Sequence, residues 1–334
     1  MNNQNAAIPP SAESSFGLPS SSLATPWRVG VLGLGHAGLF YLERLSLSAD
    51  IRLVGAFDSD SKRRGLATGS GCPLFDRWDS MLSPNVADAL FLVDDFSEEV
   101  AKAVLHGGQH LVIDRPWSVS SKVLRSLGEL AVNSNRTSTV ASPGRWSANF
   151  VSATAARRTG RLGNLRSVRL SSCEKRVPGE MSEDGVLREF GYRWLDQLFV
   201  LVESNPERVY AKLLSDGEPK QEYGFLAVID FANGCTAQIE IDTRSRLGFR
   251  TGWMIEGSSG SYRNDRLYTE IDDGEIVDEP LIHSNDSNET FISELTKKWS
   301  GASTTLPTLA DAANVVQVIE ALERSAISGE VVQV

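Results

Sequence analysis

The chain has 334 residues, of which 41% are hydrophobic and 23% are charged. This composition is typical of folded globular proteins and excludes a wholly disordered chain, and the length favours two domains. The formal net charge is −10. That charge disfavours binding to nucleic acids and to anionic membranes, because both carry negative charge themselves. No apolar run in the sequence approaches the roughly 18 residues that a membrane span needs.

The three cysteines, Cys72, Cys173 and Cys235, are far apart and form no C-x-x-C pair. Such a sparse and odd-numbered set argues against a disulfide framework and against a zinc site, so we expect no metal. It indicates a reducing compartment, and we expect a cytoplasmic protein. A secreted protein without disulfides would show the same pattern.

Residues 1–25 are rich in Ser, Ala, Asn and Pro and contain no Lys or Arg. They lack the features of a signal or transit peptide, and they cannot bury enough apolar surface to offset the entropy lost on ordering. We expect a flexible tail. An arm that lies on a neighbouring subunit is the functional alternative.

Regular structure begins after the tail with a strand–helix–strand pattern over residues 28–32, 39–47 and 51–57. Between the first strand and the helix the chain reads G-L-G-H-A-G, which comprises Gly33, Leu34, Gly35, His36, Ala37 and Gly38. The first glycine permits a tight turn, the second lets a pyrophosphate approach the backbone, and the third lets helix and strand pack closely. The N–H groups at the start of the helix then face the pyrophosphate. The pattern predicts a dinucleotide-binding loop.

Asp58 follows the second strand, 20 residues after Gly38. A carboxylate at this place accepts hydrogen bonds from the adenosine ribose and repels a 2′-phosphate, so NAD is favoured over NADP. Lys62, Arg63 and Arg64 follow closely and weaken this preference. A Rossmann-type fold that has lost its nucleotide is the alternative.

Strand and helix patterns continue to alternate after Asp58. Strands are predicted at 72–75, 88–93, 110–113 and 139–141, with helices at 77–82, after residue 97 to 105, and at 118–131. This alternation predicts a Rossmann-type, doubly wound parallel sheet in a dinucleotide-binding domain over 26–143. Ligands bind such sheets at the carboxyl ends of the strands, where Asp94, Asp95 and Arg115 are expected. We include Asp94 among the cofactor-binding candidates, whereas Asp95 or Ser97 fits a helix N-cap.

The second half changes to long strands, several of which alternate apolar and polar residues, with an Asn233-Gly234 hairpin turn. We predict an α+β domain over 144–334 with an open, mainly antiparallel sheet for substrate binding and oligomerisation. Helices are expected at 150–158, 186–202 and 289–299. A last helix over 308–327, with Thr308 and Asp311 at its cap and Gly329 at its end, can pack back on the first domain.

In this order and spacing, several motifs resemble the glucose–fructose oxidoreductase / inositol dehydrogenase (Gfo/Idh/MocA) family from about Trp27 to Val334. They are RVGVLGLGHAG, the strand ending in Asp58, DALFLV, AVLHGGQHLVIDRPWS, RRTGRLGNLRSVRL, WMIEGSSGSY and VIEALERSAISGEVVQV. The resemblance implies hydride transfer between NAD(P) and a sugar, polyol or related hydroxy compound. It also implies a homodimer or homotetramer.

The resemblance implies three catalytic positions, and this chain departs from the family at each. The family's Glu-Lys-Pro motif is Asp114-Arg115-Pro116 here, so Arg115 replaces the lysine. On the second-domain helix, Glu189 stands at the family's Asp position and Arg193 at its His position, while Asp196 matches a further acidic position. Of the three substituted residues only Glu189 can take a proton, because arginine stays protonated.

Tyr192 is a second nearby acid, although it falls one position short of the face that carries the family's His. Arg115, Arg193 and Arg145 can form a cationic site that faces the nicotinamide. Paired guanidiniums bind carboxylates in a bidentate manner, so we expect an anionic substrate such as a uronate, keto acid or sugar acid. In the alternative interpretation these arginines form structural ion pairs with Glu189, Asp196 or Asp114.

Two functions therefore stay open on the sequence. The first is an NAD-dependent oxidoreductase with an altered substrate. The second is a non-catalytic NAD(H)- or sugar-binding sensor or scaffold that has lost the family's Lys, Asp and His. Trp117 and Trp146 flank Arg115 and Arg145. Either indole can stack on a sugar ring or simply pack in the core.

Overall fold

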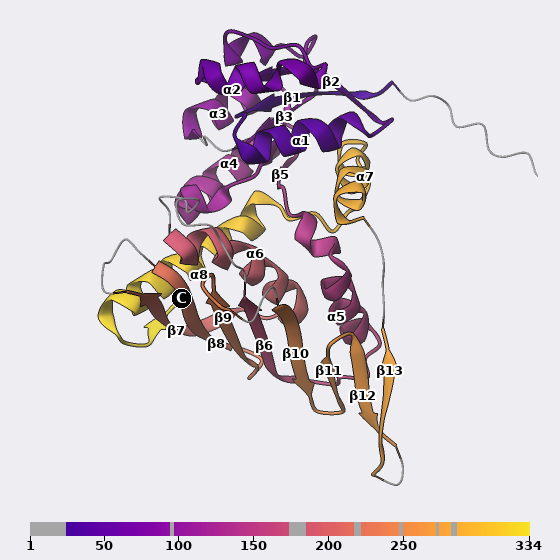
Figure 1. The fold of residues 1–334 in the computed structure, drawn as a ribbon, viewed down its shortest axis with the longest axis vertical. Helices are drawn as coiled ribbons and strands as arrows, with labels where there is room; N and C mark the ends of the chain where they lie inside the picture. The colour runs from indigo at the N-terminus through magenta and orange to yellow at the C-terminus, as the bar shows by residue number, and fades with distance from the viewer. Residues whose placement is uncertain are drawn as a thin grey trace, which may run out of the picture.

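The computed structural model describes residues 25–93, 97–173, 185–216, 222–246, 250–271, 274–281 and 286–334. Two sheets dominate it, one built from each half of the chain, with helices packed on both (Figure 1). No helix in these ranges is both long and apolar enough to cross a bilayer.

The first sheet is parallel and has the strand order β2-β1-β3-β4-β5. Its strands are β1 (Trp27–Leu32), β2 (Ile51–Phe57), β3 (Ala89–Leu92), β4 (His110–Ile113) and β5 (Ser138–Val140). Every residue of β3 is buried, as the near-continuous apolar runs of a sheet covered on both faces require. The strand order reverses between β1 and β3, which places the expected ligand crevice at the carboxyl ends of these strands.

The prediction of a strand at 72–75 was wrong. Leu74 makes a single bridge to Ala56, with hydrogen bonds from Ala56 to Pro73 and from Phe75 to Ala56. Pro73 has no N–H with which to extend the ladder. The Phe75 ring instead covers Gly55, where a Cβ would come within 2.3 Å of it. The described part of the sheet therefore has five strands, and residues 72–75 form a covering loop.

The helices of the first half are α1 (His36–Ser46), α2 (Ser61–Leu66), α3 (Glu98–His106) and α4 (Ser121–Asn133). Ser97 caps α3 by accepting a hydrogen bond from Val100 N, one of the two caps expected; Asp95 lies outside the described residues. The short helix predicted at 77–82 is a single 3₁₀ turn, Trp78–Met81. Three more 3₁₀ turns are η1 (Ala67–Ser70), η3 (Pro116–Ser118) and η4 (Pro143–Trp146).

Among the described residues, the second sheet has nine strands in the order β13-β12-β11-β10-β6-β9-β8-β7-β14 and is antiparallel except for β6 with β9. Its strands are β6 (Leu165–Cys173), β7 (Pro206–Ser215), β8 (Glu222–Phe231), β9 (Thr236–Asp242), β10 (Arg250–Gly257), β11 (Gly260–Arg263), β12 (Arg266–Glu270), β13 (Ile276–Pro280) and β14 (Val332–Gln333). The expected alternation holds in β7, where Val209 and Ala211 are buried and Tyr210 is exposed. One face therefore packs on helices and the other is open.

The helices of the second half are α5 (Ala148–Arg158), α6 (Gly185–Val202), α7 (Ser287–Trp299) and α8 (Leu309–Ser328). Helix α8 contacts both α6 and β7, and it also packs along α4 of the first half, as Figure 1 shows. Glu320 of α8 accepts hydrogen bonds from the backbone and the hydroxyl of Ser121. The last helix therefore joins the two halves.

Helix α7 was not expected at the first sheet, yet it packs there beside α1 and η4 (Figure 1). Its buried residues Phe291, Leu295 and Trp299 belong to the same apolar cluster as Val29 and Leu42. The Trp299 ring lies 5.6 Å from that of Trp27. Residues late in the chain thus complete the core of the nucleotide-binding half.

Candidate functional site

The glycine loop has the local geometry that its sequence predicted. Gly33 has a φ of +100°, which a residue with a side chain rarely adopts, and its N–H bonds to Phe57 O at 2.8 Å. Gly35 occupies the N-cap of α1 and has no side chain to cover the helix end. Backbone N–H groups and the positive end of the helix dipole therefore lie where a pyrophosphate would bind.

Asp58 lies directly after β2 and is 2% exposed. Its carboxylate accepts hydrogen bonds from Leu34 N at 2.7 Å and from Asp60 N at 2.8 Å. Arg63 approaches the same carboxylate at 3.6 Å. Asp58 thus holds the glycine loop in place, and its position next to that loop is the one that a ribose-binding acid requires.

A cavity of about 850 Å³ lies between the two halves, within the size range of small-molecule sites. It is lined by His36, Ala37, Tyr41, Asp114, Arg115, Trp117, Ala141, Ser142, Pro143, Gly144, Arg145, Ser147, Glu189, Phe190, Tyr192, Arg193, Asp196, Gln197 and Ser287. Every predicted catalytic and substrate residue is therefore brought together with the first turn of α1. Asp94 lies outside the described residues.

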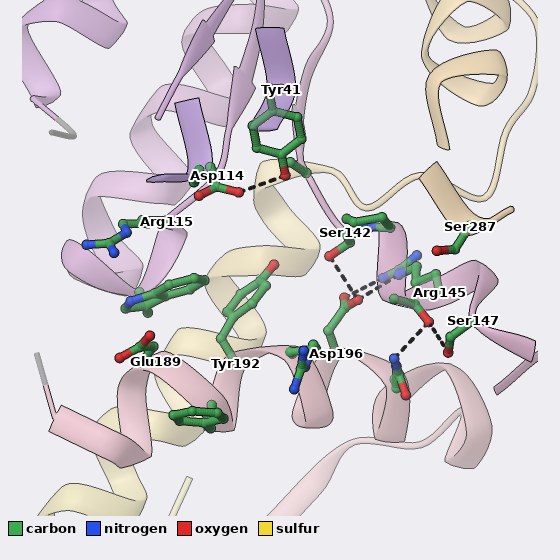
Figure 2. Close-up of a pocket in the computed structure, with 18 of the residues that line it drawn as sticks. Tyr41, Asp114, Arg115, Ser142, Arg145, Ser147, Glu189, Tyr192, Asp196 and Ser287 are labelled. Carbon is green, nitrogen blue, oxygen red and sulfur yellow. Dashed lines mark hydrogen bonds and ion pairs between the residues drawn. The ribbon is translucent and has the colours of Figure 1, made fainter. Parts of the chain in front are cut away.

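The carboxyl end of β4 forms one wall of the cavity. Asp114 there accepts a hydrogen bond from the Tyr41 hydroxyl at 2.8 Å, as Figure 2 shows. Arg115 is the next residue and lines the cavity. Its guanidinium forms no ion pair with any residue in the described ranges. Arg115 therefore presents a positive charge to the cavity at the edge where the parallel strands end.

Helix α6 forms the opposite wall with Glu189, Tyr192 and Asp196 (Figure 2), and Arg193 of the same helix also lines the cavity. Its far side is buried against the second sheet and α8. Arg188 fixes the start of the helix through a bidentate pair with Glu323 of α8, at 2.5 and 2.7 Å, and a bond to Trp117 O at 2.8 Å. Arg193 is exposed, with its guanidinium 4.6 Å from the centre of the Trp194 ring.

Arg145 was expected to help bind a substrate anion, and the structure shows its guanidinium paired with Asp196. Its guanidinium donates to both carboxylate oxygens of Asp196, at 2.8 and 2.5 Å, and to Thr305 O at 2.6 Å. Burial opposes its charge, but Asp196 outweighs burial and raises the pKa of Arg145. Ser142 adds a 3.3 Å bond to Asp196. Arg145 therefore forms the ion pair with Asp196 that the sequence left open as the alternative, and this pair joins η4 to α6.

Tyr192 is 1% exposed, and its ring packs against that of Trp117 at 5.6 Å. Its hydroxyl oxygen has no hydrogen-bond partner among the described residues. An unsatisfied buried polar group costs about 1–3 kcal/mol, so it needs an explanation. Burial and then the Asp196 carboxylate raise the pKa of Tyr192 well above its ordinary value. The phenol therefore stays protonated at neutral pH.

Several cavity residues were not predicted, notably Tyr41, Ser142 and Gln197. Tyr41 lies four residues after Ala37, so helical spacing could have found it. Ser142 follows β5, at the strand ends where ligands were expected. Gln197 donates to Gly144 O at 2.9 Å, a contact between segments 53 residues apart that no local pattern signals. Of the two tryptophans, Trp117 lines the cavity, and Trp146 packs on Phe291 at 6.1 Å.

Comparison with known proteins supports the family. A model described as "Oxidoreductase family, NAD-binding Rossmann fold" matches residues 27–142, and a GFO/IDH/MocA C-terminal domain model matches residues 150–263. The chain belongs to the Gfo/Idh/MocA family. It combines the NAD-binding Rossmann fold of that family with its C-terminal sheet domain.

Among curated Gfo/Idh/MocA-type enzymes, UDP-N-acetylglucosamine 3-dehydrogenase of Acidithiobacillus ferrooxidans is 30% identical over 98 residues. These residues are 28% of this chain and 30% of that enzyme, so the match spans less than a third of the relative's length.

Solved structures match over almost the whole chain. An NAD-binding protein from Listeria innocua is 20% identical with a TM-score of 0.81, covering 93% of this chain and 100% of its own. An oxidoreductase from Agrobacterium radiobacter, solved with NAD⁺, L-tartaric acid and magnesium, is 16% identical with a TM-score of 0.81, covering 92% and 98%. At these identities the likeness shows that the Gfo/Idh/MocA fold is shared.

Proposed function

We propose that this protein is an oxidoreductase that transfers a hydride between a nicotinamide dinucleotide, preferentially NAD(H), and an anionic hydroxy or keto compound. The observation that carries the proposal is the shared cavity. The first turn of α1, Arg115 at the end of β4, and the polar face of α6 all line it. A dinucleotide held by the loop would reach a substrate held by the second half.

The residues present fit a dinucleotide. Gly33 and Gly35 leave the N-terminus of α1 open to a pyrophosphate, and Asp58 stands beside them for the ribose. A bound nicotinamide supplies or accepts the hydride. Asp58 favours NAD by repelling a 2′-phosphate, although Arg63 at 3.6 Å reduces that repulsion.

The charge on the substrate follows from the cavity's cations. Arg145 is neutralised by Asp196, whereas Arg115, which also lines the cavity, has no ion pair among the described residues. A guanidinium binds a carboxylate through two parallel hydrogen bonds and also stabilises a developing alkoxide. A sugar acid, uronate or keto acid offers both a carboxylate to bind and an oxygen on which such a charge develops. The Agrobacterium protein, similar in fold, was solved with L-tartaric acid, itself an anionic hydroxy acid.

Calorimetric titration with NAD⁺, NADH, NADP⁺ and NADPH tests the cofactor. We expect micromolar NAD(H) affinity. In Asp58→Ala the ratio of NADPH to NADH affinity should rise about tenfold, because the carboxylate no longer repels the 2′-phosphate. Asp60→Ala is the matched control, since Asp60 is an exposed cap of α2. If the wild type binds no dinucleotide, the oxidoreductase is excluded and the fold serves recognition alone.

A second experiment distinguishes an altered enzyme from a sensor that binds its ligand without turnover. The sensor is favoured by one observation: arginines, Arg115 and Arg193, stand where the family has Lys and His. The protein is screened with sugar acids, keto acids and neutral polyols. The triple variant Arg115→Lys, Glu189→Asp, Arg193→His is screened in parallel. Loss of an existing activity in the triple variant supports an altered enzyme, and activity gained only there supports the sensor. Turnover restricted to neutral polyols would refute the anionic substrate.

A further inference from the structure

We propose that the Tyr192 hydroxyl binds the oxygen at the reacting carbon of the substrate and gives that oxygen its proton when a carbonyl is reduced. The inference rests on the proposed oxidoreductase function and supplies the proton donor that Arg115 cannot be.

The geometry around Tyr192 carries the inference. Its side chain is 1% exposed, and its hydroxyl has no hydrogen-bond partner among the described residues. Figure 2 shows the hydroxyl pointing from α6 across the site, into the space between Asp114 and Ser142. A buried hydroxyl that lines a ligand-sized cavity and lacks a partner is satisfied when a ligand oxygen occupies that space.

Two carboxylates near Tyr192 already accept hydrogen bonds from other side chains. Asp196 is held by Arg145 and Ser142, and Asp114 accepts the Tyr41 hydroxyl. Arg115 and Arg193 keep their protons because guanidinium does not deprotonate in proteins. Glu189 is the remaining acid of the α6 wall, and Figure 2 places it on the side toward Arg115, away from Ser142. Tyr192 is thus the residue of the α6 wall whose hydroxyl faces the space between Asp114 and Ser142 and can give up a proton.

The step balances as a reduction. The carbonyl carbon gains a hydride, which the reduced nicotinamide supplies as it is oxidised. The electron pair of the C=O π bond moves to oxygen, and that oxygen forms a bond to the Tyr192 proton. The resulting phenolate regains a proton from water.

The electrostatics favour this direction. Burial and Asp196 both hold the phenol in its protonated form, with the pKa well above its ordinary value. At neutral pH the protonated phenol is ready to donate to a carbonyl oxygen, whereas removal of a proton from an alcohol needs the phenolate, which forms only at higher pH. We therefore expect reduction to be the faster direction at neutral pH and oxidation to accelerate as pH rises.

Tyr192→Phe tests the proposal, with Tyr262→Phe as its matched control. Tyr262 is also buried, but it lies outside the cavity, and its hydroxyl bonds to Asn149 O and Asp265. In Tyr192→Phe, kcat for reduction should fall about 100-fold with a smaller rise in KM, and the rise of oxidation with pH should disappear. Tyr262→Phe should keep kcat and its pH profile.

A readout on the ligand-free protein guards against a merely structural role. Removing a hydroxyl that has no partner should leave the melting temperature of Tyr192→Phe unchanged or raised, whereas Tyr262→Phe should melt lower. D-glucuronate and L-tartrate, added with NADH, then serve as anionic probes. They should raise the melting temperature of the wild type more than that of Tyr192→Phe.

The outcomes separate the two proposals. If the wild type turns over and Tyr192→Phe keeps kcat within about threefold, the Tyr192 proposal is overturned and the function stands. The same holds if Glu189→Gln, and not Tyr192→Phe, removes the pH dependence. If ligand-free Tyr192→Phe melts as low as Tyr262→Phe, the hydroxyl has a structural partner and the proposal fails. A wild type that binds no dinucleotide overturns both.

Discussion

Arg115 and Arg145 carry the same charge and line the same cavity, yet they do different things there. The guanidinium of Arg145 forms a bidentate ion pair with Asp196, which lies 51 residues away in the sequence. Arg115 has no such pair among the described residues, so its charge acts on the cavity. The difference is set by whether a carboxylate faces the guanidinium, since a buried charge is tolerated when it is paired.

We expect the half-buried side chain of His110 to make the stability of the protein depend on pH. Its Nδ1 accepts the Thr137 N–H at 3.0 Å, and the Trp299 ring stacks on it at 6.1 Å. Burial, and then the charge of Arg136, lower the pKa of His110 from 6.5 to about 4. The unfolded chain therefore binds a proton more readily between these values. The contribution of neutral His110 to the free energy of unfolding is therefore fully present above pH 6.5 and is lost as the pH falls toward 4.

We expect this loss to be on the order of 2 kcal/mol, after allowing for the solvent that reaches the half-buried ring. Urea unfolding of the wild type and of His110→Gln, across pH 7 to about 4.5, measures it. The variant should show a weaker pH dependence than the wild type. His106→Gln changes an exposed histidine and should keep the wild-type slope. Equal slopes for His110→Gln and the wild type would contradict the prediction.

Helix α6 shows what an element contributes to the site. The family-like spacing set Glu189 and Arg193 on one face and left Tyr192 one position short of it. In the structure Tyr192 lines the cavity too, because the cavity wall spans more than one residue row of the helix. Tyr192 and Asp196 are four residues apart and therefore neighbours on that wall. Their adjacency is what lets Asp196 act on the phenol.

Helix α8 gives a prediction at the scale of an element. Its capping box is complete: Thr308 Oγ1 accepts from Asp311 N at 3.2 Å, and Asp311 accepts from Thr308 N at 2.8 Å. Thr308→Ala should lower the free energy of unfolding by about 1 kcal/mol, because helix N–H groups lose their acceptor. Thr308→Ser keeps the hydroxyl and should stay near wild type. Chemical denaturation of the three proteins measures this, and a Thr308→Ala protein as stable as wild type would refute the cap's contribution.

At the scale of the whole molecule, the two halves are not independent. Helix α8 bonds to α4 through Glu320 and Ser121, and α7 supplies Trp299 to the apolar cluster around β1. The cavity lies where these halves meet, so its shape depends on both. The expected homo-oligomer stays a prediction.

Trp299→Ala tests this dependence. Trp299 is 6% exposed and packs against Trp27 and His110 of the first sheet. We expect a loss of about 3–5 kcal/mol, as for other buried aromatic side chains. Hydrogen exchange should accelerate in β1 and β2 more than in β8 and β9. Ile327→Ala, at an 86% exposed site, should change little. Faster exchange confined to the second sheet would show that α7 does not support the first.

The sequence by itself determined the features that depend on near neighbours. The strand–helix order, the Gly33–Gly38 loop, the end of β2 at Asp58 and the Thr308 cap all follow from patterns within a few residues, and the structure has each of them. The resemblance also identified the positions of Arg115, Glu189 and Arg193, which do share one cavity.

Only the tertiary structure decided what depends on distant partners. Packing brings Arg145 against Asp196 and leaves the Tyr192 hydroxyl without a hydrogen-bond partner in the described residues. It also places α7 against the first sheet. It also turned the apolar stretch at 72–75 into a covering loop, because Phe75 packs over Gly55. Helical and strand periodicity are local properties of a chain, whereas ion pairs and orphaned hydroxyls arise from how separate elements pack.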